Sequence, residues 1–200
     1  ERGEIGKVAE SAREVAAALG RWIARGYDVI ALVPSCAVMR KFEWKLILPD
    51  DPAVKRLSES TFDISEYVVD IAKKDGLAPG LEPIEGGISL HIACHARAQN
   101  MGQKATEMLR LIPGTRVAPI ERCSGHGGSW GVMEENFETA IRGGKPVARQ
   151  GAKAKTAHVA SECPLAGMHV LQGLEREGAE VPESAPHPIE LFARAYGIAV

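Results

Sequence analysis

Apolar residues recur every three or four positions in several stretches of the chain, a spacing typical of helices with one buried face. The clearest stretch covers residues 5–19, and the pattern can be continued past Gly20 as far as Gly26. Asp63, followed by Glu66 three positions later, predicts a capped helix over 63–74. Further helices are predicted at 38–48, 102–112, 130–141, 146–155, 165–177 and 187–196.

Short runs rich in β-branched and other apolar residues separate these helices and predict buried strands. The runs cover 28–33, 88–93, 115–120 and 156–160. Strands that alternate with helices form βαβ units, in which the strands lie parallel and the connections are right-handed. The pattern therefore predicts an α/β fold with a parallel sheet.

The stretches between these elements suggest a division of the chain. Residues 49–62 are polar and predicted to be irregular, and 75–87 contain four glycines and two prolines, as expected for a linker. The segments 28–36 and 156–163 share an order of strand, short turn, cysteine and helix, which suggests a duplicated unit. The predicted divisions are a remnant of a first repeat at 1–50, a helix and linker at 51–86, and a second repeat at 87–200.

The first repeat is expected to depend on the second. It offers one predicted strand, and a single strand leaves its edges unpaired. We therefore expect the apolar run 29–33 to pair with a strand of the second repeat or else to stay exposed. The chain starts at Glu1 without an initiating methionine, so we expect it to be a fragment of a longer protein.

Composition narrows the class of function. The 200 residues carry a formal net charge of −2, and acidic and basic residues are interspersed, so no basic surface for nucleic acid is predicted. No apolar run approaches the roughly 18 residues that span a bilayer, and no secretory signal opens the chain. The expected location is the cytoplasm, with contact to the inner membrane through partners as an option.

Cysteine placement is the most informative chemical feature. Cys94, Cys123 and Cys163 each follow the end of a predicted strand. The carboxyl ends of parallel strands meet at one edge of a sheet, where ligands bind in α/β folds. In a reducing compartment such cysteines are more often metal ligands or catalytic thiols than disulfides. The sequence therefore predicts a thiolate site for a metal ion or an iron–sulfur cluster.

The surrounding motifs carry a family resemblance. A lone Cys94, then Cys123 in a Cys-Ser-Gly-x-Gly-Gly turn, then Cys163-Pro before a helix resembles the cysteine-rich CCG domain. That domain occurs in the B-type subunit of heterodisulfide reductase and in the C-type subunit of anaerobic glycerol-3-phosphate dehydrogenase. Supporting segments are 109–115, 130–132 and 187–191, and the likeness covers about residues 86–200.

The resemblance implies an iron–sulfur module that transfers electrons within a larger oxidoreductase. It implies a [4Fe-4S] cluster, an upstream ferredoxin-type domain or subunit, and a flavoprotein or quinone-linked redox partner. The chain is expected to be a subunit or domain of an oxidoreductase. The sequence leaves open whether it catalyses a reaction itself.

The chain also departs from the family pattern. Cys123-Ser124-Gly125 stands where the family has Cys-Cys-Gly, and a single Cys163 stands where it has Cys-x-x-Cys. The family uses five thiolates for a non-cubane cluster, and this repeat has three. The resemblance is therefore closest to the glycerol-3-phosphate dehydrogenase C-like proteins, with a cubane cluster as the expected cofactor.

A cubane cluster normally takes four ligands. The fourth is predicted to be Cys36, in the place of the first repeat's closing cysteine, or one of the histidines His126, His95 and His169. A lone cysteine is often a small buried residue, and this interpretation stays open for Cys36. Zinc accepts the same donors, so a zinc-stabilised scaffold or interaction domain without redox activity is the first alternative.

The glycine turn at 125–128 offers a second alternative, a phosphate-binding enzyme or hydrolase. The turn lacks the lysine of a P-loop, and a glycine beside a metal ligand is explained by close backbone approach. No dinucleotide fingerprint follows a strand, and Ser124 is not in a nucleophile elbow. His91 and His158 fall inside predicted strands and are expected to be structural.

Overall fold

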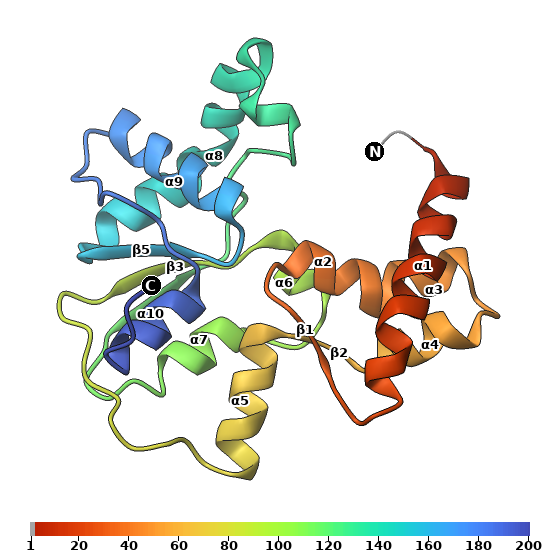
Figure 1. The fold of residues 1–200 in the computed structure, drawn as a ribbon. Coiled ribbons are helices and arrows are strands. Elements are labelled where there is room, and N and C mark those ends of the chain that lie inside the picture. The colour runs from red at the N-terminus through yellow and green to blue at the C-terminus, as the bar shows by residue number, and fades with distance from the viewer. Residues whose placement is uncertain (1–2) are drawn as a thin grey trace. The chain divides into compact units, whose positions relative to one another are not determined.

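The computed structural model describes residues 3–200, which form two compact units. Unit 1 comprises the described residues up to Tyr67, and unit 2 comprises Val68–Val200. The two units are shown together in Figure 1, and each is described by itself. The first two residues of the segment 1–50, predicted as a first repeat, lie outside the described residues.

Helices and strands alternate in both units. Unit 1 contains α1 (Ile5–Ile23), β1 (Val29–Ala31), α2 (Pro34–Val38), the π-helical turn η1 (Met39–Glu43), α3 (Trp44–Ile47), α4 (Pro52–Glu59) and β2 (Thr61–Asp63). α5 (Ile64–Lys74) crosses the boundary between the units. Unit 2 contains β3 (Ile88–His91), α6 (Cys94–Ala98), α7 (Lys104–Leu109), β4 (Val117–Ile120), the 3₁₀ turn η2 (Trp130–Val132), α8 (Glu134–Ala154), β5 (His158–Ser161), α9 (Pro164–Arg176) and α10 (Pro188–Ala195).

The unit 1 sheet corrects two expectations. β1 pairs in parallel with β2, Val29 opposite Thr61, so the strand finds its partner inside unit 1 rather than in the second repeat. The segment 49–62, predicted to be irregular, contains α4 and the start of β2. The side chain of Asp51 begins α4 by accepting hydrogen bonds from the amides of Ala53 and Val54 at 2.9 and 3.2 Å.

Unit 2 is built on a parallel sheet with strand order β4-β3-β5. The central strand β3 ends at His91, which pairs with Ile120 of β4 on one side and Ser161 of β5 on the other. The three predicted strands are thus confirmed as one parallel sheet, and none of their starts or ends is shifted by more than two residues. A mixed α/β fold with short parallel sheets is the observed class.

Helices cover both faces of the unit 2 sheet (Figure 1). α7 and α10 pack on Ile88 and Leu90 of β3, which are fully buried. α8 and α9 pack on the other face, against Ile120 and Val159. His91 shares that second face, because alternate residues of a strand point to opposite sides and in-register neighbours to the same side.

α8 differs from the prediction of two helices. It runs unbroken from Glu134 to Ala154, through Gly143, Gly144 and Pro146. The segment that begins at Trp130 forms a separate 3₁₀ turn instead of the first turn of this helix. The helix continues through both glycines. The missing side chain at Gly144 lets the loop at Ser124 pack directly on the helix backbone.

Other helix boundaries follow local signals in the sequence. α1 continues beyond Gly20 to Ile23, as the longer interpretation of its pattern allowed. Asp63 caps α5 as predicted: its carboxylate accepts the amide of Ser65 at 2.9 Å, and Glu66 accepts the amide of Asp63 at 3.2 Å. His187 caps α10 with Glu190 in a capping box. These short-range interactions need no information from the rest of the chain.

Candidate metal centre

Each of three cysteines follows the carboxyl end of one strand of the unit 2 sheet. Cys94 is the first residue of α6, after β3; Cys123 lies in the loop after β4; Cys163 immediately precedes α9, after β5. The three strands are neighbours, and His91 at the end of the central strand is in register with the last residue of each flanking strand. Three turns that carry cysteines therefore leave the same edge of one sheet.

All four cysteines are free thiols, and two of the sulfurs accept a hydrogen bond. The amide of Gly125 donates to Sγ of Cys123 at 3.3 Å, and the guanidinium of Arg97 donates to Sγ of Cys94 at 3.5 Å. Cys94 and Cys123 are exposed, and Cys163 is half-buried. Donated hydrogen bonds favour the thiolate, which is the form that binds metals.

The turn after Cys123 packs on α8 through backbone atoms. A Cβ at Gly125, where φ is +88°, would lie 2.1 Å from the carbonyl oxygen of Ala140. A Cβ at Gly144 would lie 2.2 Å from the carbonyl oxygen of Ser124. Only glycine fits at these two positions, so close packing accounts for both residues without a bound phosphate.

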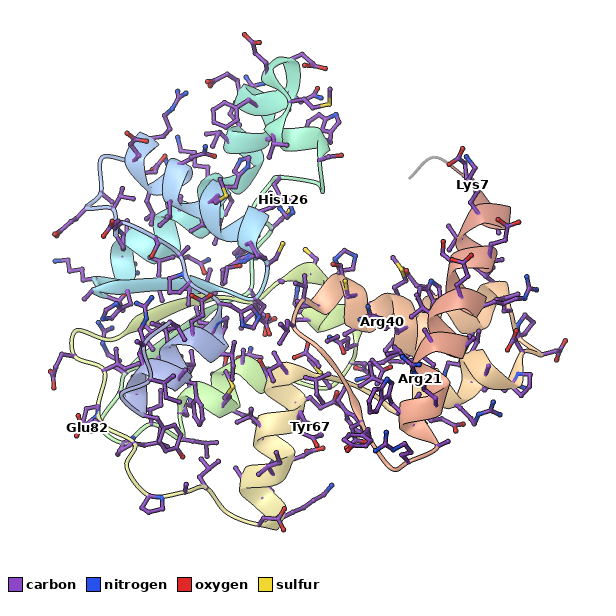
Figure 2. All side chains as sticks on the ribbon, in the orientation of Figure 1. Lys7, Arg21, Arg40, Tyr67, Glu82 and His126 are labelled. Carbon is purple, nitrogen blue, oxygen red and sulfur yellow. The ribbon has the colours of Figure 1, made fainter. Side chains whose placement is uncertain are left out.

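His126 lies on the same loop, between β4 and α8, as Figure 2 shows. Its Nδ1 is 2.7 Å from Oγ of the buried Ser124. Burial, and after it the charge of His95, lowers the pKa of His126. A neutral imidazole is the form that ligates metals, and Nε2 is the ring nitrogen that the Ser124 contact leaves for that role.

His169 is the most unusual of the candidate ligands. It lies on α9, is 2% exposed and contacts Phe137 with a ring-centroid separation of 5.9 Å. Neither ring nitrogen makes a hydrogen bond of ordinary geometry. Burial, and after it the charge of His126, lowers the pKa of His169. The ring is thus a neutral, buried group beside α8.

Two polar residues that the sequence did not single out lie at the same edge. Ser161 ends β5 and Glu162 follows it, and each is at most 2% exposed. Oγ of Ser161 contacts Nδ1 of His91 at 3.0 Å, and the Glu162 carboxylate accepts the amide of Ala93 at 3.0 Å. The signal that could have identified them is two polar residues between an apolar strand and Cys163.

Cys36 belongs to unit 1 and lies on α2. It is the third residue of its helix, two positions after Pro34, whereas Cys163 precedes Pro164 by one position. The two cysteines are therefore not at equivalent places relative to their helices. The assignment of Cys36 as the fourth ligand stays a prediction, and so does the duplication.

The donor types suit an iron–sulfur cluster or zinc, since three thiols and several neutral histidines are present. Within residues 3–200, no three side chains of His, Cys, Asp or Glu are grouped closely enough to hold a metal ion. A single zinc ion would hold its sulfurs about 3.8 Å apart, from bonds of about 2.3 Å in a tetrahedron. A polynuclear cluster takes the same donors at larger separations.

No helix among the described residues is long and apolar enough to cross a membrane.

Comparison with known proteins links the chain distantly to oxidoreductase subunits. No family model matches it. The subunit designated B of fumarate reductase (CoM/CoB) from Methanothermobacter marburgensis is 30% identical over 123 residues, which is 60% of this chain and 24% of that protein. The subunit designated C of anaerobic glycerol-3-phosphate dehydrogenase from Escherichia coli K12 is 24% identical over 172 residues, which is 86% of this chain and 41% of that protein. The O157:H7 protein of the same name gives the same values. The chain spans less than half the length of these curated relatives.

Proposed function

We propose that this chain is an iron–sulfur cluster-binding, electron-transfer module of a larger oxidoreductase, with Cys94, Cys123 and Cys163 as cluster ligands. The observation that carries the proposal is the position of these cysteines, each just past the end of one of three neighbouring parallel strands. The distant relatives are subunits of a fumarate reductase and a dehydrogenase, which supports a role in redox chemistry.

The residues around the sulfurs are suited to hold anionic ligands. The Gly125 amide and the Arg97 guanidinium each donate to a cysteine sulfur, and such donors stabilise the charge of a thiolate. His126 is neutral and lies three positions after Cys123. A [4Fe-4S] cluster bound by these residues supplies reversible one-electron transfer.

The module would work between redox partners. We propose an upstream ferredoxin-type domain or subunit on one side and a flavoprotein or quinone-linked protein on the other, in the cytoplasm or at the inner membrane through those partners. Subunits of multi-component oxidoreductases among the relatives support partners of this kind.

Anaerobic purification with counts of iron, sulfide and zinc tests the proposal. We expect about four irons and four sulfides per chain, a brown colour and broad visible absorbance. Serine in place of Cys94, Cys123 or Cys163 should each remove most of the iron, while circular dichroism stays unchanged. Zinc without sulfide would support the scaffold alternative, and a chain with neither metal would contradict both.

Separate variants identify the fourth ligand. If Cys36 is the ligand, Cys36→Ser should lower the iron content as much as Cys163→Ser. Unchanged iron in Cys36→Ser, together with loss in His126→Ala or His169→Ala, assigns a histidine instead. His158→Ala, on β5, is the control, because this histidine lies inside a strand and outside the cysteine turns.

A further inference from the structure

His91 joins two of the cysteine turns through one ring. It ends the central strand β3, is 2% exposed, and its Nε2 lies 3.0 Å from the carbonyl oxygen of Arg122, the residue before Cys123. A carbonyl can only accept, so Nε2 carries the proton and donates. Nδ1 is then an acceptor, and the hydroxyl of Ser161 at 3.0 Å donates to it.

Ser161 extends this connection to the third turn. Its Oγ also accepts the amide of Cys163 at 3.2 Å. A continuous chain of hydrogen bonds therefore runs from the carbonyl before Cys123, through His91 and Ser161, to the amide of Cys163 itself. Burial lowers the pKa of His91 to about 4, so the neutral tautomer that this chain requires is the form present at neutral pH.

Glu162 connects the remaining turn. It is 2% exposed, and its carboxylate accepts the amide of Ala93, the residue before Cys94, at 3.0 Å. Three of these four hydrogen bonds end on backbone groups of, or next to, the three cysteines, and the fourth joins the side chains of His91 and Ser161.

We propose that His91, Ser161 and Glu162 form a polar clasp that fixes the three cysteine turns relative to one another and so sets the spacing of their thiols. The three are positioning residues, since their hydrogen bonds to the turns end on backbone groups and not on the cysteine sulfurs. The inference rests on the proposed function, because a fixed spacing of the thiols serves to bind a cluster. The spacing itself can be measured in the metal-free chain.

A cross-linking series tests the clasp. The full chain, reduced and metal-free, carries Cys36→Ser and Cys94→Ser so that Cys123 and Cys163 are the remaining thiols. Bis-maleimides of graded length should cross-link this pair with a sharp preference for one length. In Ser161→Ala the preference should flatten, with at least a tenfold lower yield at the preferred length, and Ser161→Thr, which keeps the hydroxyl, should restore it.

Ser89→Ala is the matched control. Ser89 lies on the same strand and face as His91, is buried, and accepts a hydrogen bond from Thr156 at 2.8 Å, away from the cysteine turns. Its loss removes a comparable side-chain hydrogen bond to a residue beside β5 and should leave the length preference intact. His91→Phe should behave like Ser161→Ala if it folds, and the serine pair decides the question if it does not.

The outcomes separate this inference from the proposed function. An unchanged length preference in Ser161→Ala, or no preference in the parent chain, overturns the clasp. A chain that shows the clasp but takes up no iron and sulfide overturns the proposed cofactor instead. In loaded protein, Ser161→Ala should also change the electron paramagnetic resonance line shape of the reduced cluster, and Ser161→Thr should return it toward that of the parent.

Discussion

The two glycines at the contact between the Cys123 turn and α8 tie a candidate ligand to the packing of unit 2. The carbonyl of Ser124 faces Gly144, and Gly125 faces the carbonyl of Ala140. No side chain separates the loop from the helix at these points. Any shift of α8 is therefore transmitted directly to the residues beside Cys123.

Gly125→Ala should destabilise unit 2 by about 3 kcal/mol. The methyl group would overlap backbone atoms of Ala140 and Gly144, and φ of +88° is unfavourable for an L-residue. Urea denaturation measures the change. Gly178→Ala, at φ +67° with open space around its Cβ, is the control and should cost only about 1 kcal/mol. Equal losses in the two variants would show that backbone conformation, and not close packing, sets the requirement at Gly125.

His91 should make the chain less stable in mild acid. Its pKa is lowered from 6.5 to about 4 in the folded chain, with burial as the main cause, so the unfolded chain binds more protons between these values. The stability is fully present above pH 6.5 and is lost as pH falls toward 4, by about 3 kcal/mol in total. Denaturation curves at pH 7 and pH 4.5 measure it.

His91→Gln is the comparison for this pH dependence, because glutamine keeps a side-chain N–H for the Arg122 carbonyl but does not titrate. Its stability should change less between pH 7 and pH 4.5 than that of the parent. Some dependence should remain, since burial also lowers the pKa of His126 and the pKa of His169. Identical pH profiles in parent and variant would show that the pKa of His91 is not lowered on folding.

At the scale of elements, α4 and β2 give unit 1 a sheet of its own. Asp51 caps α4, and the chain then reaches Thr61, the first residue of β2, whose hydroxyl donates to the Leu57 carbonyl of α4 at 2.6 Å. β1 then pairs along its three residues with β2. The apolar run in β1 is thus paired locally.

Asp51→Ala should lower the stability of unit 1 by about 1 kcal/mol, because the amides of Ala53 and Val54 lose their acceptor. Hydrogen exchange of the α1 and α4 amides measures the effect. Asp51→Asn keeps an acceptor oxygen and should be nearly neutral in stability. This variant separates capping from the ion pair that Asp51 makes at 3.6 Å with the exposed side chain of Arg13. An equal loss in both variants would assign the effect to charge.

Local signals predicted much of the fold, and packing between distant segments set the rest. The capping pair Asp63 and Glu66 and the parallel strands of unit 2 were predicted correctly, because their patterns lie within a few neighbouring residues. Gly143, Gly144 and Pro146 were interpreted as the end of one helix and the start of another. That was wrong, because Gly144 allows the approach of Ser124, which lies twenty positions earlier.

The same division applies to the candidate site. The cysteines could be placed after strands from apolar runs alone, since strand ends are visible in the sequence. The roles of Ser161 and Glu162 could not be predicted from the sequence, because their hydrogen-bond partners His91 and Ala93 are about seventy positions away. β2 was missed because a strand of three residues is too short to show alternation.

At the scale of the whole molecule, the four thiols should differ in reactivity. In the reduced, metal-free chain, Cys36, Cys94 and Cys123 are exposed and should react quickly with iodoacetamide, and the half-buried Cys163 should react last. Mass spectrometry of the labelled peptides measures the order, and urea should remove the differences. Anaerobic iron loading should protect Cys94, Cys123 and Cys163 together. Continued rapid labelling of one of them in loaded protein would remove it from the ligand set.

The strand order of unit 2 has a consequence for how the protein is made. Of the three strands in this sheet, the central strand β3 is synthesised first. Its partner β5 follows only after a long stretch of chain, since His91 and Ser161 are seventy positions apart. A sheet with such distant pairing forms slowly, because the intervening chain must be ordered before the contact is gained. Cys94 and Cys123 therefore leave the ribosome well before Cys163 can join them. If the proposed cluster binds at this edge, its delivery has to wait until β5 is in place, and Cys94 and Cys123 are open to oxidation during that interval.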